Sequence, residues 1–222
     1  SSDVIIYSRK NQDQLAVEFF ENIEYRRVSI AANKIFNGLS KLLSKLPPKS
    51  IYFASSCYGF DYALRIALDL RKQQCDIVHI HNFSQFVPII RAFNPDLKIV
   101  LHMHCEWLSQ LDQKLTSKRL KKVDLIVGCS NYITEKIKNR FPQFADRCQT
   151  VFNGVDSQDF INSDRIHKNK QKIIYVGRIS PEKGIHTLLD AFAIVKDKYP
   201  SAQLEIIGPQ KPTPTEFLAS LS

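Results

Sequence analysis

Two groups of residues have the types and spacing for chemistry, and the first is a turn of glycine and positive charge. Gly177-Arg178 and Lys183-Gly184 stand between a short β-branched run and apolar residues at helical spacing, which predicts a strand-to-helix connection. Glycine lets the backbone approach an anion closely, a helix N-terminus offers N–H groups, and arginine and lysine add positive charge. The turn is therefore expected to bind phosphate; the alternative is an ordinary tight turn with two solvated cations.

The second group is a set of histidines that follow two predicted strands. His79 and His81 alternate along one strand and so share a face, which suggests a metal pair, but the spacing ties no third ligand to them. A polar edge that contacts an acceptor, with Asn82 beside it, is the favoured interpretation over zinc. His102 and His104 come at the end of the next strand, where a core or surface role is the alternative to a binding role.

Alternating strands and helices must position these residues. Apolar runs predict strands over residues 77–80, 98–102 and 125–127, and amphipathic patterns predict helices over 61–72, 85–93, 110–121 and 132–141. Such alternation is typical of a parallel sheet covered on both faces, which binds ligands at the carboxyl ends of its strands. Upstream we expect a strand over 3–7, an extended piece over 17–25, a helix over 30–46 and a strand over 51–54. Downstream we expect strands over 173–176 and 203–207 around a helix.

Composition limits the class of protein. The 222 residues carry a formal net charge of +9, no run of 18 apolar residues, and five cysteines without metal-ligand spacing. We expect a cytoplasmic protein, at most peripheral at the inner membrane face. Two basic clusters are present. A solvated face is the ordinary interpretation of both, and an anionic membrane surface or a charged acceptor is a candidate partner of the first. The clusters are Lys114, Lys118, Arg119, Lys121 and Lys122 on one predicted helix, and Arg165, Lys168, Lys170 and Lys172 in a polar stretch.

The words GRISPEKG, with the helix and strand that follow, resemble the family-4 glycosyltransferases of the GT-B fold. The resemblance continues upstream through VDLIVGCSNYITEKI and VFNGVDSQDF, in the order in which the family has these blocks. It implies an α/β protein of two Rossmann-like domains: an acceptor-side domain over residues 1–158, a linker over 159–171, and the start of a nucleotide-sugar domain over 172–222.

The resemblance also implies an activity. Family members of this kind are retaining glycosyltransferases that move a sugar from a nucleotide-diphosphate sugar, of UDP or GDP type, to a carbohydrate or lipid-linked acceptor, without a required metal. Polysaccharide or glycoconjugate synthesis at the cell surface is the expected setting. The resemblance assigns the donor diphosphate to Arg178 and Lys183, with Gly177 and Gly184 beside them, and the sugar to the catalytic His104. By residue type and position, His81, Asn82 and Glu106 are candidates for contact with the acceptor or the cleft. Asn153 matches a passage near the cleft, although a structural role is the favoured interpretation.

Two features of the family pattern are absent from the sequence. The pair of glutamates, seven residues apart, that hold the donor would follow Ser222, and the Gly-rich loop that opens the first domain has no match before Gly38. We therefore expect a fragment truncated at both ends and inactive alone. The alternative is a non-catalytic GT-B-like binding or scaffolding module. A nucleic-acid binder is suggested only by the net charge, and no nucleic-acid motif accompanies it, so no nucleic acid is expected as a partner.

Overall fold

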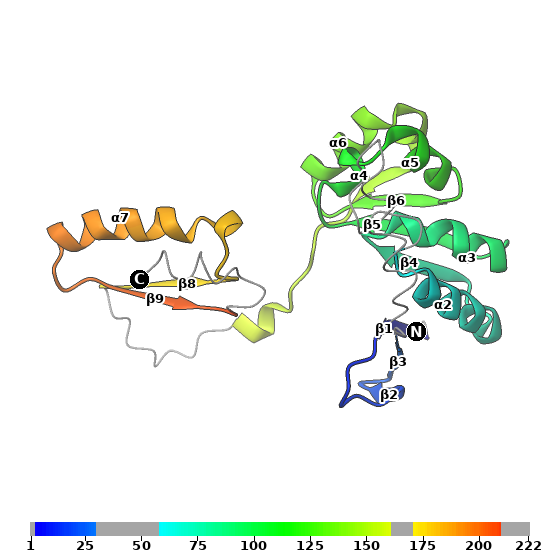
Figure 1. Cartoon of the computed structure of the whole chain (residues 1–222), viewed down its shortest axis with the longest axis horizontal. Helices are drawn as coiled ribbons and strands as arrows, with labels where there is room; N and C mark the ends of the chain where they lie inside the picture. The colour runs from blue at the N-terminus through cyan, green and yellow to red at the C-terminus, as the bar shows by residue number, and fades with distance from the viewer. Residues whose placement is uncertain (1–2, 30–57, 161–170, 210–222) are drawn as a thin grey trace. The chain divides into compact units, whose positions relative to one another are not determined.

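The computed structural model describes residues 3–29, 58–160 and 171–209 of the chain (Figure 1). They belong to two compact units, Ser1–Val155 and Asp156–Ser222, each of which is described by itself. The helix expected over 30–46, the strand over 51–54, most of the basic stretch over 165–172 and the tail beyond residue 209 lie outside the described residues. No helix in the described part of the chain is long and apolar enough to cross a membrane.

The first unit is built around a four-stranded parallel sheet. Its strands run in the order β4 (Ile77–His81), β5 (Lys98–Met103), β6 (Leu125–Gly128) and β7 (Cys148–Thr150). The first three were predicted as strands, because continuous apolar runs suit a sheet that is buried on both faces. All four carboxyl ends meet at one edge of the sheet, which is the edge where such sheets bind ligands.

Helices connect these strands. The helices are α2 (Phe60–Gln73), α3 (Val87–Phe93), α4 (Trp107–Gln110), α5 (Gln113–Leu120) and α6 (Asn131–Arg140), with single 3-10 stretches at Ser84–Phe86 and Pro142–Arg147. The helix expected over 110–121 corresponds to α5, which begins at Gln113, whereas Gln110 ends the separate short helix α4. Leu111 is extended, and Asp112 caps α5 by accepting a 2.7 Å hydrogen bond from the backbone N–H of Leu115. Aspartate favours such a cap over a helix interior.

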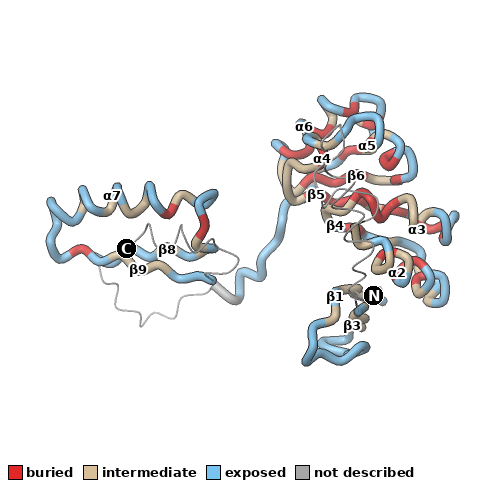
Figure 2. The backbone as a smooth tube through the Cα atoms, viewed as in Figure 1, coloured by how far each residue is buried: buried red, intermediate tan, exposed pale blue. Residues whose placement is uncertain are grey.

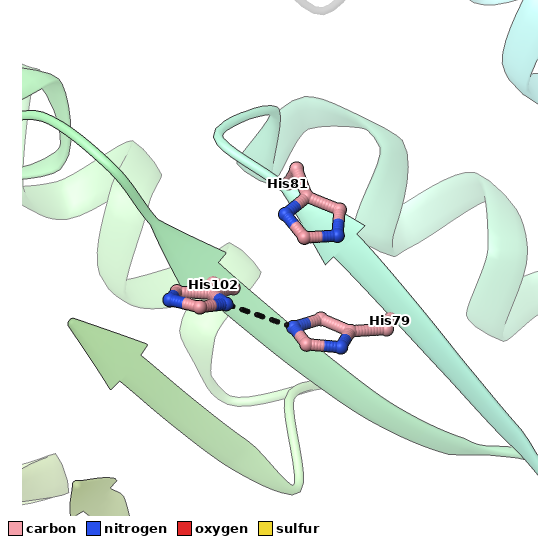
Figure 3. Close-up of side chains that lie close together, drawn as sticks. All are labelled: His79, His81 and His102. Carbon is pink, nitrogen blue, oxygen red and sulfur yellow. Dashed lines mark hydrogen bonds between the residues drawn. The ribbon is translucent and has the colours of Figure 1, made fainter. Parts of the chain in front are cut away.

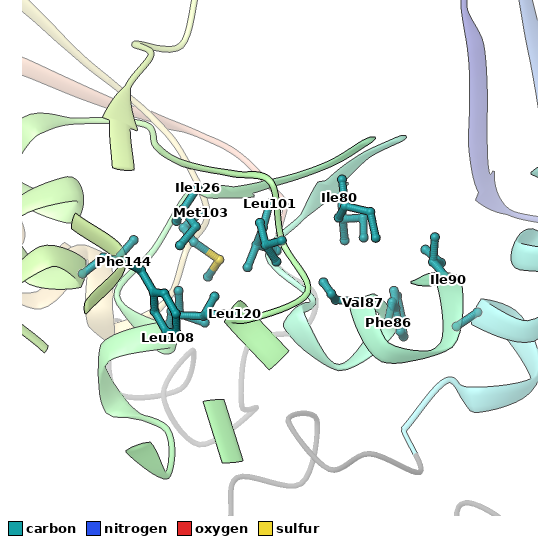
Figure 4. Close-up of a cluster of buried hydrophobic side chains, with 14 of the residues drawn as sticks. Ile80, Phe86, Val87, Ile90, Leu101, Met103, Leu108, Leu120, Ile126 and Phe144 are labelled. Atoms are coloured by element: carbon teal, nitrogen blue, oxygen red, sulfur yellow. The ribbon is translucent and has the colours of Figure 1, made fainter. Parts of the chain in front are cut away.

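The core of this unit lies between one face of the sheet and the helices. Ile80, Leu101 and Met103 belong to one buried cluster on that face, together with Val87 and Ile90 of α3 (Figure 4). Figure 2 shows the buried residues concentrated in the sheet strands and the helices beside them. Because side chains alternate along a strand, the residues between these apolar ones face the opposite side of the sheet.

A second, smaller sheet is formed by the N-terminal residues. Its order is β1 (Ile5–Arg9), β3 (Ile23–Val28) and β2 (Val17–Phe20), with β1 parallel and β2 antiparallel to β3. The expected single extended piece over 17–25 is therefore two strands. The chain reverses at Glu21 and Asn22, whose φ angles are +49° and +64°; asparagine adopts this left-handed conformation more readily than most residues.

Hydrogen bonds attach the small sheet to α2. The Tyr7 hydroxyl donates to Asp69 at 2.7 Å, and Arg26 pairs with the same carboxylate at 2.9 Å. Asp69 lies on α2, so β1 and β3 share one acceptor on that helix. Burial and then the hydrogen bond to Asp69 raise the pKa of Tyr7 well above its ordinary value, so this hydroxyl remains a donor.

The second unit is a strand, helix and strand repeat. β8 (Lys172–Val176) and β9 (Gln203–Ile207) are parallel neighbours, and α7 (Ile185–Lys198) connects them. All three elements were predicted from the sequence. Of the apolar side chains on these strands, Ile174 is 55% exposed and Val176 is 75% exposed, so this unit buries much less of its apolar surface than the first.

Candidate functional site

Three histidines project from one face of the parallel sheet. The register of β4 and β5 places His81 beside His102, and His79 lies two residues before His81 on the same side. Figure 3 shows the three rings together on one side of the two strands. Each residue has one ring nitrogen that lies within 4.8 Å of a ring nitrogen of each of the other two. The sequence tied no third ligand to His79 and His81 by spacing; the register of the two strands brings a third imidazole, His102, to the same face.

His104 extends the group to a cluster of four imidazoles, called the histidine cluster below (His79, His81, His102 and His104). Nδ1 of His81 lies 2.8 Å from Nε2 of His104, and Nδ1 of His102 lies 3.1 Å from Nε2 of His79. In each pair one ring donates a proton and the other accepts it. The rings also stack, with the centroids of His102 and His104 4.2 Å apart.

The environment keeps the inner rings of the histidine cluster neutral. Burial, followed by the neighbouring His104 and His79 rings, lowers the pKa of His102 to about 4. Burial and then His104 lower the pKa of His79; burial, His79 and His104 lower that of His81. A neutral imidazole has one nitrogen with a free lone pair, so these rings can accept a hydrogen bond or bind a metal ion.

Asn82 joins the ends of the two strands and sets the position of His104. Its backbone N–H donates to the carbonyl of His102 at 2.9 Å, and its side-chain oxygen accepts from the backbone N–H of His104 at 2.7 Å. Asn82 has φ of +64°, a conformation that asparagine tolerates. The sequence interpretation placed Asn82 near the sugar acceptor. In the structure its side-chain oxygen accepts a hydrogen bond from the backbone of His104. Burial raises the pKa of the adjacent Cys105 thiol, which disfavours the nucleophilic thiolate.

Glu106 follows on the same loop and is held by α6. Its carboxylate accepts hydrogen bonds from Lys136 and from Tyr132, both at 3.0 Å. The Lys136 bond, and then the Tyr132 bond, lower the pKa of Glu106, which is ionised at neutral pH. Sequence reasoning missed both partners. Their spacing of four residues places them on one face of the predicted helix, but no local pattern connects that face with Glu106.

The remaining cleft candidate, Asn153, lies elsewhere in the first unit. It follows β7, which is at the opposite edge of the sheet from β4, and it is exposed. The structure therefore brings together His81, Asn82 and His104, with Glu106 on the adjoining loop. Asn153 follows β7, which is separated from β5 by one strand and from β4 by two.

In the second unit, the predicted phosphate turn follows β8 directly. The backbone N–H of Gly177 donates to the carbonyl of Ile207 at 2.9 Å, so the turn begins as a continuation of the β8–β9 pairing. Gly184 has φ of +70° and precedes α7, a position that favours glycine. Arg178 and Lys183 are both exposed, and Arg178 pairs with Glu182 at 3.5 Å.

Gly208 is a further residue of this turn that sequence reasoning did not single out. A Cβ atom at Gly208 would overlap the carbonyl oxygen of Gly177 and lie 2.7 Å from its carbonyl carbon. The two backbones can approach this closely only because residue 208 has no side chain. The signal in the sequence was a glycine at the end of each of two parallel strands.

One member of the first basic cluster is not on a solvated face. Arg119 is 2% exposed, and its Nη1 donates to the hydroxyl of Ser84 at 3.3 Å. Burial lowers its pKa to about 10. The expectation that all five cations share one helix is also wrong, because α5 ends at Leu120 and Lys121 and Lys122 follow it. Lys114, Lys118, Lys121 and Lys122 are exposed.

Solved structures define the class of this fold. A trehalose-6-phosphate synthase, OtsA, matches with a TM-score of 0.65 at 15% identity, over 92% of this chain and 57% of that one. HepE of Anabaena, solved in complex with UDP-glucose, matches with a TM-score of 0.51 at 17% identity, over 72% and 46% of the two chains. At such identities the likeness concerns the fold alone. With the parallel sheets described above, it defines an α/β protein of GT-B type, as the sequence predicted.

Family models name the family within that class. The model of Glycosyltransferase Family 4 matches residues 26–159, more than half of the chain, and that of Glycosyl transferases group 1 matches residues 156–220. The chain therefore belongs to glycosyltransferase family 4, which confirms the resemblance drawn from its motifs.

Curated relatives agree with the family. Spore coat protein SA of Bacillus subtilis (strain 168) is 28% identical over 163 residues, which cover 66% of this chain and 43% of that protein. The lipopolysaccharide 1,2-N-acetylglucosaminetransferase of Salmonella typhimurium is 25% identical over 193 residues, which cover 83% of this chain and 48% of that enzyme. The chain spans less than half the length of these relatives.

Proposed function

We propose that this chain is part of a retaining glycosyltransferase that moves a sugar from a nucleotide-diphosphate sugar to an acceptor hydroxyl. In that reaction the bond between the anomeric carbon and the diphosphate breaks, a bond to the acceptor oxygen forms, and the hydroxyl proton leaves. The observation that carries the proposal is the turn between β8 and α7, where glycine backbone, two exposed cations and a helix N-terminus meet. Membership in the family supports it.

The turn would act on the charge of the leaving group. Negative charge develops on the departing diphosphate, and fixed positive groups aimed at such charge stabilise a transition state by several kcal/mol in comparable sites. Arg178 and Lys183 are the cations of the turn, and α7, a helix of 14 residues, adds the positive end of its dipole behind Gly184. Arg178 pairs with Glu182 at 3.5 Å, and a diphosphate would compete with that carboxylate for the guanidinium.

His104 is the residue we assign to the sugar. It follows a buried parallel strand at the edge where such sheets bind ligands, and Asn82 and His81 hold its backbone and ring in place. An imidazole held in this way can hydrogen-bond a sugar hydroxyl.

The donor and the acceptor belong to the same proposal. A UDP-type donor is supported by the UDP-glucose complex of the Anabaena fold relative, and a glycoconjugate acceptor by the name of the Salmonella relative. The exposed Lys114, Lys118, Lys121 and Lys122 are a surface on which a lipid-linked acceptor or an anionic membrane would be attracted.

The test compares three variants made in the whole protein of which this chain is proposed to be a part. Arg178→Ala and Lys183→Ala are each expected to lower transfer and UDP affinity by about tenfold or more, because each removes one charge from the diphosphate site. Lys198→Ala, at the other end of α7, is the matched control and should leave both unchanged. Unchanged transfer in both turn variants would refute the assignment. UDP binding without transfer to any acceptor would favour a non-catalytic binding module.

A further inference from the structure

The histidine cluster contains more nitrogen donors than a sugar-contacting edge requires. Three of its residues, His79, His81 and His102, place one ring nitrogen each within 4.8 Å of the others. Within this group, Nδ1 of His102 and Nε2 of His79 are 3.1 Å apart. Zinc binds imidazole nitrogen at about 2.0–2.1 Å, so two ligands of a tetrahedral ion are separated by roughly 3.3 Å. This pair already has the separation that a shared ion requires.

A second observation concerns the other nitrogen of the His102 ring. His102 is 6% exposed, and its Nε2 has no hydrogen-bond partner among the residues that the structure describes. A buried polar atom without a partner is costly, and native proteins contain few of them. His102 thus offers an ion either of two ring nitrogens: Nδ1, which faces Nε2 of His79, or Nε2, which has no partner among the described residues.

We propose that His79, His81 and His102 form a binding site for a transition-metal ion of the zinc class, with one coordination position left open. Imidazole donors suit zinc, nickel and copper, whereas magnesium and calcium prefer oxygen ligands. No carboxylate belongs to the group of three. Three histidines with a fourth, open position is the arrangement in which a bound metal ion also binds water or a substrate oxygen.

Only small movements separate the present geometry from such a site. The widest nitrogen pair has to close by about 1.5 Å to reach the tetrahedral separation, and rotation of the imidazole rings about χ2, a soft torsion, supplies movements of that size. His79 and His81 are exposed, so their rings have room to turn, while His102 is fixed by burial. The hydrogen bond between His81 and His104 adds the outer contact that commonly orients a metal-binding histidine.

The experiment uses the full 222-residue chain, free of any affinity tag and stripped of metal with a chelator. Zinc titrated into it by calorimetry should bind at about one equivalent. Cobalt should give the absorption bands of a nitrogen-bound, low-symmetry ion without a thiolate charge-transfer band, because the three proposed ligands are imidazoles. His79 and His81 are exposed, so they can be replaced without emptying a buried position. His79→Gln and His81→Gln should each raise the zinc Kd by about tenfold or more, because each removes one ligand.

His186→Gln, on α7 of the second unit, is the control and should leave the zinc Kd unchanged. Because His102 is buried, His102→Gln is interpreted only if its circular dichroism matches the parent, and the two exposed variants decide the outcome. A zinc Kd weaker than about 1 mM, a thiolate charge-transfer band, or tight binding that survives both exposed variants would each overturn the proposal. None of these readouts depends on transferase activity.

Discussion

Nδ1 of His81 and Nε2 of His104 lie 2.8 Å apart, although 23 residues separate them in the sequence. His81 ends β4 and His104 follows β5, so the parallel pairing of these strands creates the contact. The contact means that the ring assigned to the sugar is oriented by a second imidazole. His102 and His104 differ in position: His102 is 6% exposed within β5, whereas His104 follows the end of that strand, and we propose different roles for them.

The two roles predict different results for two substitutions. His104→Ala should lower transfer by about tenfold or more with little change in UDP affinity or thermal midpoint, because the ring would contact the sugar and not the diphosphate. His102→Ala should lower the stability of the fold by about 2 kcal/mol or more, since it empties a buried position and leaves His79 without its partner. The measurements are transfer rate, UDP affinity and thermal midpoint for each variant, with chelator present. Loss of transfer at normal stability in His102→Ala, with His104→Ala active, would show that the sugar-facing residue is His102.

Gly208→Ala tests the close approach of the β8 and β9 ends. A methyl group there would overlap the Gly177 carbonyl and break the hydrogen bond from Gly177 to Ile207. We expect a loss of about 1–3 kcal/mol in the stability of the second unit and weaker UDP binding, because the turn that follows β8 would shift. Hydrogen exchange of the β8 and β9 amides measures the first effect. Gly154→Ala, whose added carbon meets no atom within 4 Å, is the control. Equal protection in both variants would contradict the steric argument.

We expect the ionised carboxylate of Asp124 to account for part of the acid sensitivity of the first unit. Burial opposes its ionisation, but hydrogen bonds from the backbone N–H of Ile99 and from Arg91 and Lys98 outweigh burial, so its pKa lies below the ordinary value. A lowered folded-state pKa contributes stability that is present above the unfolded-state pKa of about 3.9 and is lost as the pH falls through the folded-state value.

Asp124→Asn should therefore lose about 1–2 kcal/mol of stability at pH 7, and this deficit should shrink as the pH falls below about 4. Urea unfolding from pH 7 to pH 3 gives the difference between the two proteins. The histidines are the same in both, so they cancel in that difference. A deficit that stays constant over this range would mean that the carboxylate charge of Asp124 does not stabilise the fold.

Much of the fold could be predicted from the sequence because the relevant signals are local. Continuous apolar runs predicted β4, β5 and β6, since strands buried on both faces need apolar side chains on both. The turn between Gly177 and Gly184 was found because its glycines, cations and following helix are contiguous in the chain. The chain reversal at Glu21 and Asn22 was not predicted. β-forming residues on both sides of the turn make the sequence resemble one continuous strand.

The histidine cluster shows what only the tertiary structure decided. The sequence determined that two His-x-His pairs end consecutive strands, and alternation placed His79 and His81 on one face. It did not determine that His102 lies beside His81, because that depends on the register of two strands joined by a helix. Arg119 shows the same limit: a cation next to four exposed lysines was predicted to be solvated, but the packing of α5 buries it against Ser84. Side-chain type and spacing set which face a residue shares with its neighbours along the chain, whereas its partners across the fold are set by how separate elements pack.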